Sequence, residues 1–262
     1  MNLEIVLGKV RSLTMEVADF IEKEAETFDT GKIEYKGFND LVSYLDKESE
    51  KKLIKGLGEI LPEAGFIAEE GTSSKKGDEY QWIIDPLDGT TNFTHGLPVF
   101  AISIALLKGD HIVLGVVHEI NRNEVFYSIE NGKAFCNDKE ISVSGVKSLD
   151  HSLLATGFPY YNFEKMPNYL SALNELMQKT HGLRRMGSAA VDLVYVACGR
   201  FEAFFEYNLN AWDVAAGAFI VQQAGGYVSD FSGGDNYLFG REIAASCEIH
   251  QEMLQVIQKN WN

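Results

Sequence analysis

The sequence predicts a protein of the α+β or α/β class, in which two subdomains pack into one compact unit. Three features predict this class: an amphipathic helix at the start, strand-length apolar segments in the middle, and alternating strands and helices in the last third. The 262 residues suit one large domain or two intimate ones, and an apolar fraction of 45% supplies a sizeable core. We expect an N-terminal α+β subdomain over residues 1–147 and a C-terminal α/β subdomain over residues 148–262.

Helical patterns open the N-terminal half, and strand patterns follow them. Apolar residues recur at helical spacing from Leu3 to Phe28, and a second such pattern covers residues 46–61. Residues 32–35 alternate like a short strand, and residues 65–68 form a short apolar run. Turn residues separate the next apolar segments, which indicates an antiparallel sheet. Its strands are expected at residues 80–84, 99–107, 112–118 and 124–129.

In the C-terminal half, segments with the apolar spacing of strands alternate with segments that have the apolar spacing of helices, as is typical of an α/β arrangement. Strands are expected at residues 152–156, 201–206 and 242–245. Helices are expected at residues 169–179, 191–198, 214–224 and 249–258. Gly199 and Gly225 stand just after two of these helical patterns, where glycine commonly ends a helix.

Acidic residues outnumber basic ones, with 38 Asp and Glu against 23 Lys and Arg and a net charge of −15. Broad binding to a nucleic-acid backbone needs a basic surface, so we expect no nucleic-acid partner. Phosphate chemistry stays open, because metal ions can hold a phosphate at an acidic site. Without an apolar stretch of membrane-spanning length or a secretory signal, we expect a cytoplasmic protein with no membrane partner. Scattered cysteines favour neither a disulfide framework nor a zinc site: Cys136, Cys198 and Cys247.

The most informative segment is WIIDPLDGTTNF, residues 82–93, in which a buried run ends in Asp85 and Asp88. Carboxylates that leave water must be paired, hydrogen-bonded or metal-bound, because desolvation costs each of them several kcal/mol. Gly89 lets another group approach closely, and Thr90 and Thr91 offer hydroxyl and N–H groups at the start of a helical turn. Two cation-binding acids beside an anion-binding turn predict a metal-bridged phosphate.

Other acidic residues also stand at the ends of predicted elements. Glu69 and Glu70 follow a short apolar run, and Asp213 opens an otherwise apolar helix. One of the two glutamates, the two aspartates of residues 82–93 and Asp213 give four acids from three element ends, which suit hard cations such as Mg²⁺. Two such ions can stabilise both the attacking and the leaving oxygen of a phosphoryl transfer. The histidines lack the paired spacing of zinc sites, so we do not expect zinc.

Residues 82–93, the upstream Glu69-Glu70 pair and the downstream Trp212-Asp213 pair resemble, in order and spacing, the inositol monophosphatases. These enzymes belong to the lithium-sensitive, Mg-dependent sugar-phosphatase superfamily, and the resemblance runs from Lys36 to about Ala245. It implies a layered αβαβα sandwich of the inositol monophosphatase and fructose-1,6-bisphosphatase type, and a homodimer. It also implies a phosphatase that binds two or three Mg²⁺ ions and hydrolyses a small phosphorylated polyol, with myo-inositol monophosphate as the first candidate.

The resemblance assigns a role to each matching residue. Metal ligation falls to four acids and one backbone carbonyl: Glu69, Asp85, Asp88, Asp213 and the carbonyl of Leu87. Phosphate binding falls to the turn residues Gly89, Thr90 and Thr91. Catalysis, through a water that the metals activate, falls to Thr90, Asp46 and Glu69. Contacts with the substrate ring fall to Gly187, Ser188, Ala189 and Glu206. Near the metal site stand two further candidates, Lys36 and Glu70.

Two other activities of the superfamily stay open, namely those of a 3′(2′),5′-bisphosphate nucleotidase and of a fructose-1,6-bisphosphatase. Thr91, Asn92 and Phe93 favour inositol phosphate, because the nucleotidases usually continue there with Lys/Glu-type residues, and Glu206 favours it as well. An alternative of another class is a non-catalytic binding or regulatory protein on the same scaffold.

Overall fold

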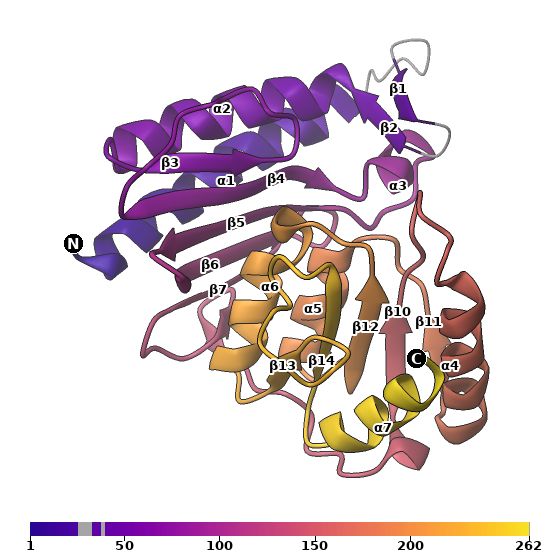
Figure 1. The fold of residues 1–262 in the computed structure, drawn as a ribbon. Helices are drawn as coiled ribbons and strands as arrows, with labels where there is room; N and C mark the ends of the chain where they lie inside the picture. Colours follow the sequence, from indigo (N-terminus) through magenta and orange to yellow (C-terminus); the bar gives the residue numbers. More distant parts are fainter. Residues whose placement is uncertain (26–32, 38–39, 262) are drawn as a thin grey trace.

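The computed structural model describes residues 1–25, 33–37 and 40–261, and these stack in five layers (Figure 1). Helices α1 (Leu3–Ala25) and α2 (Tyr44–Ile60) pack together on one face of a seven-stranded sheet. Helices α5 (Ala189–Ala197) and α6 (Ala211–Gln223) separate this sheet from a five-stranded one. Helices α4 (Met166–Lys179) and α7 (His250–Trp261) cover the outer face of the second sheet. The predicted αβαβα sandwich is confirmed.

The seven-stranded sheet has its strands in the order β3-β4-β5-β6-β7-β8-β9. Their bounds are β3 (Gly65–Ala68), β4 (Tyr80–Asp88), β5 (Ala101–Lys108), β6 (His111–Glu119), β7 (Glu124–Ile129), β8 (Phe135–Cys136) and β9 (Lys139–Glu140). All neighbouring pairs are antiparallel except β3 and β4, which are parallel. The antiparallel prediction therefore holds from β4 onward, and β3 differs because residues 69–79 carry the chain back before β4 begins.

The five-stranded sheet has the order β11-β10-β12-β14-β13. Its strands are β10 (Leu153–Thr156), β11 (Gly182–Arg184), β12 (Ala203–Tyr207), β13 (Tyr227–Ser229) and β14 (Glu242–Ser246). Strand β10 is parallel to β11 and β12, whereas β14 is antiparallel to β12 and β13. The sequence predicted β10, β12 and β14 but missed β11 and β13, because three residues are too few to show a period.

Side chains alternate between the cores on the two faces of each sheet. In β4, Trp82 and Ile84 pack toward α1 and α2, whereas Ile83 packs toward α5 and α6. In β12, Phe204 faces the central helices, and Phe205 faces the core under α4 and α7. The central helices therefore meet apolar side chains from both sheets.

The central helices have no polar face of their own. All residues of α5 are buried, and so is every residue of α6 from Val214 to Val221. A helix that is apolar all round belongs in a protein interior. Here one sheet covers each side of the layer formed by α5 and α6. This packing brings the first turns of both helices close to the C-terminal end of β4.

Strand β4 extends further than the sequence predicted. The apolar pattern covers residues 80–84, but pairing with β5 continues to Asp88, with a register shift between Asp85 and Asp88. Pro86 has no N–H to donate to the ladder, which is tolerated at such an irregularity. The two acids therefore belong to the end of the strand itself.

Four smaller elements complete the described fold: β1 (Ile33–Gly37), β2 (Asp40–Ser43), α3 (Thr90–Thr94) and the 3₁₀ turn η2 (Leu149–His151). The predicted end of the first helix, from Phe28 to Gly31, lies outside the described residues. None of the described helices combines the length and the unbroken apolar character needed to cross a bilayer. All strands of the seven-stranded sheet precede residue 147 and those of the five-stranded sheet follow it, but the division into two subdomains stays a prediction.

Candidate metal and phosphate site

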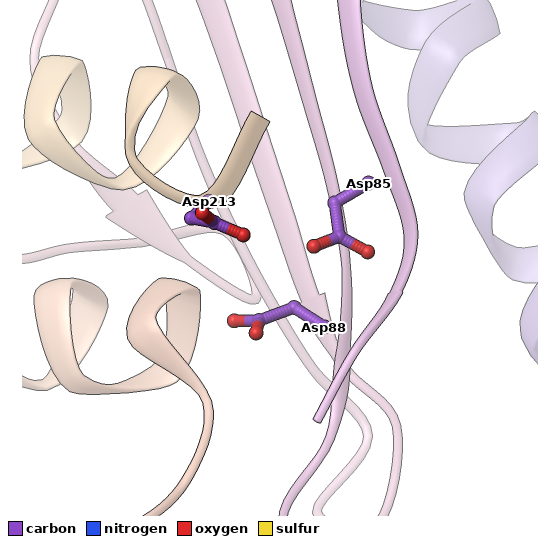
Figure 2. Close-up of side chains that lie close together, drawn as sticks. All are labelled: Asp85, Asp88 and Asp213. Atoms are coloured by element: carbon purple, nitrogen blue, oxygen red, sulfur yellow. The ribbon is translucent and has the colours of Figure 1, made fainter. Parts of the chain in front are cut away.

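Three aspartates from two distant parts of the sequence converge at the C-terminal end of β4 (Figure 2). Asp85 and Asp88 come from the end of β4, and Asp213 comes from the first turn of α6. One carboxylate oxygen of each residue lies within 4.8 Å of the others. The packing of α6 against the seven-stranded sheet therefore creates a cluster of like charges.

Hydrogen bonds from the backbone orient each of the three carboxylates. The Leu87 N–H donates to Asp85 Oδ1 at 2.9 Å, inside the irregular end of β4. The Ala190 N–H donates to Asp88 Oδ2 at 2.6 Å, and the Ser188 hydroxyl adds a second bond to that oxygen at 2.7 Å. The Asn210 N–H donates to Asp213 Oδ2 at 2.6 Å as part of the capping box of α6. The carboxylates are thus positioned before any ligand binds.

Burial and mutual repulsion make this cluster unfavourable when it is fully ionised. Burial first, and then the charges of Glu69, Asp88 and Asp213, raise the pKa of Asp85 well above its usual range. Burial raises the pKa of Asp88 to about 6, although bonds from Ser188 and Ala190 oppose it. Burial and the charge of Asp88 raise the pKa of Asp213 to about 7. A divalent cation removes this repulsion, and clustered carboxylate oxygens are the ligands that Mg²⁺ prefers, so the residues fit that ion.

Glu69 stands just after β3 and borders the same cluster. It lines the adjoining cavity, and its charge raises the pKa of Asp85. The buried carboxylate of Glu50, in α2, holds the turn that follows Glu69. It accepts hydrogen bonds from the Glu70 N–H, the Thr72 N–H and the Thr72 hydroxyl, each at 2.7 Å. Glu50 thereby fixes the backbone that presents Glu69.

A short helix, α3 (Thr90–Thr94), begins directly after Asp88. The Thr90 hydroxyl lies 2.7 Å from Asp46 Oδ1 and 3.0 Å from the Leu87 carbonyl oxygen. Both neighbours are acceptors, so the single hydroxyl hydrogen of Thr90 is donated toward them, and the lone pairs of its oxygen can accept a hydrogen bond from another donor. Asp46 is buried, with 1% of its surface exposed, whereas Thr90 is only partly buried, so the acceptor carboxylate is the member of the pair that is shielded from bulk water.

Gly89 is the residue that allows the chain to turn from β4 into α3. Its φ is +101°, and a Cβ atom there would lie 2.9 Å from the Val99 carbonyl oxygen. We expect Gly89→Ala to lower the free energy of unfolding by about 1–3 kcal/mol. Thermal and urea unfolding measure this loss. The matched control is Gly8→Ala in α1, where a Cβ would meet nothing within 4 Å and should stabilise the helix slightly. Equal effects of the two substitutions would contradict the prediction.

A cavity of about 260 Å³ opens beside the three aspartates. Its lining includes Asp88 and Asp213 and also the predicted substrate contacts Gly187, Ser188, Ala189 and Glu206. Burial raises the pKa of Glu206 to about 8, with the charges of Asp213 and Asp88 adding to the effect and Arg185 opposing it. Gly157 leaves room for Glu206, because a Cβ at that position would lie 2.0 Å from Glu206 Oε2. The predicted metal ligands and the predicted ring contacts thus border one space.

The model of the inositol monophosphatase family matches residues 3–262. The chain belongs to the inositol monophosphatase family. Among its relatives, a putative Nus factor SuhB from Neisseria meningitidis serogroup B is 45% identical over 237 residues, which are 90% of this chain and 91% of the relative. An inositol-1-monophosphatase from Mesorhizobium japonicum is 39% identical over 229 residues, 87% and 86% of the two chains. The crystal structure of extragenic suppressor protein suhB from Bartonella henselae superposes with a TM-score of 0.91 at 35% identity, covering 97% of this chain and 99% of that one.

Two predicted site residues of this family member are not among the described residues that form the cluster or line the cavity. Lys36 belongs to β1, and its side chain is outside the part of the chain that the structure describes. Glu70 does not line the described cavity, and its backbone N–H is bound to Glu50. Thr91 lies in α3, and Leu87 is fully buried with its carbonyl oxygen beside the Thr90 hydroxyl.

Three residues of the site were not predicted, namely Glu50, Arg185 and Asp192. Glu50 lies in an amphipathic helix, in which a glutamate ordinarily marks the solvent face. Arg185 lies just before the Gly187–Ala189 segment and lines the cavity with it. Asp192 carried a signal that was available in the sequence, because it is an acid inside an otherwise apolar helix.

The raised pKa values predict how Mg²⁺ should affect the stability of this inositol monophosphatase family member. Asp88 and Asp213 hold protons more tightly in the fold than at their ordinary pKa of 3.8. Because the folded state binds these two protons more tightly than the unfolded state does, the bound protons stabilise the fold. This stabilisation is complete below about pH 4 and is lost as the pH rises through the two folded-state pKa values, about 6 and about 7. The increase in Tm caused by Mg²⁺, relative to EDTA, should be small at pH 5 and several degrees larger at pH 8. Differential scanning fluorimetry measures it, and an equal increase at both pH values would contradict the prediction.

Proposed function

We propose that this chain is a Mg-dependent phosphatase that hydrolyses a phosphate monoester of a small polyol, with myo-inositol monophosphate as the first candidate substrate. The observation that carries the proposal is the cluster of Asp85, Asp88 and Asp213 at the wall of a small cavity. Membership of the inositol monophosphatase family supports a phosphatase activity. The Thr90–Asp46 pair beside the cluster supports it as well, because hydrolysis needs a group that accepts a proton from water.

Each residue has a definite part in the proposed reaction. The carboxylates of Glu69, Asp85, Asp88 and Asp213, with the Leu87 carbonyl, would hold the Mg²⁺ ions. When bound, such ions polarise the phosphate and lower the pKa of water. Thr90 would accept the proton of the attacking water as it donates its own to Asp46, which lies 2.7 Å away. The segment of Gly89, Thr90 and Thr91 would bind the phosphate oxygens through its N–H and hydroxyl groups.

The charge of the cavity favours a substrate with one phosphate over a substrate with two. Of the described residues that line it, Arg185 alone is basic, whereas five are acidic: Glu69, Asp88, Asp192, Glu206 and Asp213. Mg²⁺ would offset the charges of Glu69, Asp88 and Asp213. No proposed cation would offset those of Asp192 and Glu206 when a fructose bisphosphate or a bisphosphate nucleotide brings its second phosphate into the cavity. A neutral ring with hydroxyl groups instead offers hydrogen-bond donors that carboxylates accept. The cavity chemistry therefore favours inositol phosphate over the two alternatives within the superfamily.

Phosphate release with Mg²⁺ tests the proposal. The purified protein is assayed on inositol 1-phosphate, fructose 1,6-bisphosphate and adenosine 3′,5′-bisphosphate, each with Mg²⁺ or with EDTA. We expect the highest kcat/KM on inositol 1-phosphate and no turnover with EDTA. Turnover that survives chelation would refute metal dependence, and a preference for either bisphosphate would refute the substrate assignment.

The family resemblance extends the proposal to lithium inhibition and to a homodimer. Inhibition by LiCl in the same assay checks the first expectation. Light scattering coupled to size exclusion checks the second, because a dimer has twice the 29.2 kDa mass of the chain.

A second candidate function rests on the name Nus factor SuhB that several relatives carry. The name suggests association with RNA polymerase or nucleic acid, as a role beside or instead of catalysis. The net charge of −15 favours a protein partner over a nucleic-acid backbone. Direct binding to purified RNA polymerase, measured for the unsubstituted protein and for Asp88→Asn, tests this candidate. Equal binding by both would show that the second role does not need the first.

A further inference from the structure

Asp192 is a buried carboxylate that has no part of its own in the reaction proposed above. It lies inside α5, where every residue is buried, and 1% of its own surface is exposed. In the described part of the chain, its Oδ1 atom has no hydrogen-bond partner. A buried polar atom without a partner is destabilising, because it has lost the hydrogen bonds that it makes to water in the unfolded chain. A substrate group that donates a hydrogen bond would remove this cost when it binds.

The position of Asp192 places it in the substrate cavity. Asp192 follows Ser188 by four residues and Ala189 by three, so the three side chains share one face of the helix. All three line the cavity, as do Glu206 and Arg185. After burial, the charge of Glu206 is the main cause of the raised pKa of Asp192, and both carboxyl groups line the same cavity. Two carboxylates from α5 and β12 therefore share one side of the cavity.

Asp192 is separate from the metal cluster and from the proton-accepting pair. The three carboxylates within 4.8 Å of one another do not include it. Thr90 contacts Asp46 and the Leu87 carbonyl, which belong to other elements. A function for Asp192 in this cavity must therefore concern the part of the substrate that does not react.

We propose that Asp192 determines substrate specificity, forming with Glu206 a two-carboxylate subsite that accepts hydrogen bonds from neighbouring hydroxyl groups of a polyol ring. This inference rests on the proposed phosphatase function and deepens it by naming the substrate group that is recognised. Burial favours the protonated form of each carboxyl group, whereas hydrogen bonds donated by ring hydroxyls favour the ionised form, which only accepts, so two adjacent hydroxyl donors match this pair. The ionised carboxylates repel a second phosphate at the same place.

Two substrates that differ in hydroxyl groups test the proposal. Inositol 1-phosphate carries ring hydroxyls, whereas p-nitrophenyl phosphate has none on its leaving group. Asp192→Asn keeps the side-chain volume and one acceptor but removes the charge. We expect about a tenfold or larger increase in KM for inositol 1-phosphate, as for a lost hydrogen bond to a charged group. The kcat for inositol 1-phosphate, and kcat/KM for p-nitrophenyl phosphate, should stay within about twofold of the original.

Glu119→Gln is the matched control. Glu119 is another fully buried carboxylate with an unpartnered oxygen, in β6, and it does not line the cavity. Its substitution should leave both substrates unaffected, whatever it does to Tm. Equal losses on both substrates for Asp192→Asn, or an unchanged KM for inositol 1-phosphate, would overturn the proposed subsite.

Failure of the proposed phosphatase function would be visible separately, as absence of turnover by the unsubstituted protein on both substrates. Titration calorimetry with inositol 1-phosphate and Mg²⁺ then tests Asp192 through binding alone. A Kd about tenfold weaker in Asp192→Asn would support the subsite. Unchanged binding, or no binding by either protein, would overturn it.

Discussion

Asp213→Asn is expected to lower kcat/KM for inositol monophosphate by about 10²- to 10³-fold. The substitution removes one charge from the three-carboxylate cluster that would hold Mg²⁺. The fold should survive, because the asparagine oxygen can still accept the hydrogen bond from the Asn210 N–H that caps α6. Phosphate-release kinetics measured over a range of Mg²⁺ concentrations give the size of the loss.

The same substitution should stabilise the protein in the absence of metal. Burial and the charge of Asp88 disfavour the ionised form of Asp213, whose pKa is about 7, so a neutral amide relieves this cost at pH 8. Asp110→Asn, in the exposed turn between β5 and β6, is the control and should change neither activity nor Tm. If Asp213→Asn loses activity and metal-free stability together, the defect is in folding and the metal role is not supported.

Thr90→Val should lower kcat by about 10²- to 10⁴-fold, the range expected when a group that accepts a proton is lost. Valine keeps the shape of threonine but cannot relay a proton to Asp46, which lies 2.7 Å from the Thr90 hydroxyl. Thr90→Ser restores a hydroxyl and should recover most of the activity. Single-turnover kinetics at saturating Mg²⁺ separate this loss from weaker metal binding.

A double-mutant cycle shows whether Thr90 and Asp46 act as one unit. If they do, Thr90→Val combined with Asp46→Asn should be little worse than either change alone. Additive losses would mean that Asp46 has a separate role and that the pair does not relay a proton. An unchanged Mg²⁺ affinity in all three variants would confine the effect to the chemical step.

Most of the fold could be predicted because the apolar residues of each large helix or strand recur at the spacing typical of that element. The helical spacing of residues 46–61 and the apolar run 65–68 correspond closely to α2 and β3. The direction of β3 could not be predicted, since an apolar run does not reveal whether it lies parallel or antiparallel to its partner, and β3 is parallel to β4. The extension of β4 to Asp88 also depends on pairing with β5, which local sequence does not encode.

The site was predictable where its chemistry is concentrated in one segment. Asp85, Asp88 and Thr90 fall within residues 82–93, and an acid at the start of an apolar helix marked Asp213. The role of Glu50 could not be predicted from the sequence, because it arises only when α2 packs over the turn after β3. Asp192 was overlooked although it interrupts an apolar helix, and its use depends on a cavity that forms between distant elements.

The all-apolar central layer also limits how this protein can be divided or enlarged. Without the second sheet, α5 and α6 would expose one of their two apolar sides to water, and without the first sheet they would expose the other. A part of the chain that has the central helices and only one of the two sheets could therefore not serve as an independently folding domain, either in a fusion protein or in evolution by domain shuffling. New sequence is best accommodated in exposed turns that are not part of the central helices, such as residues 108–110.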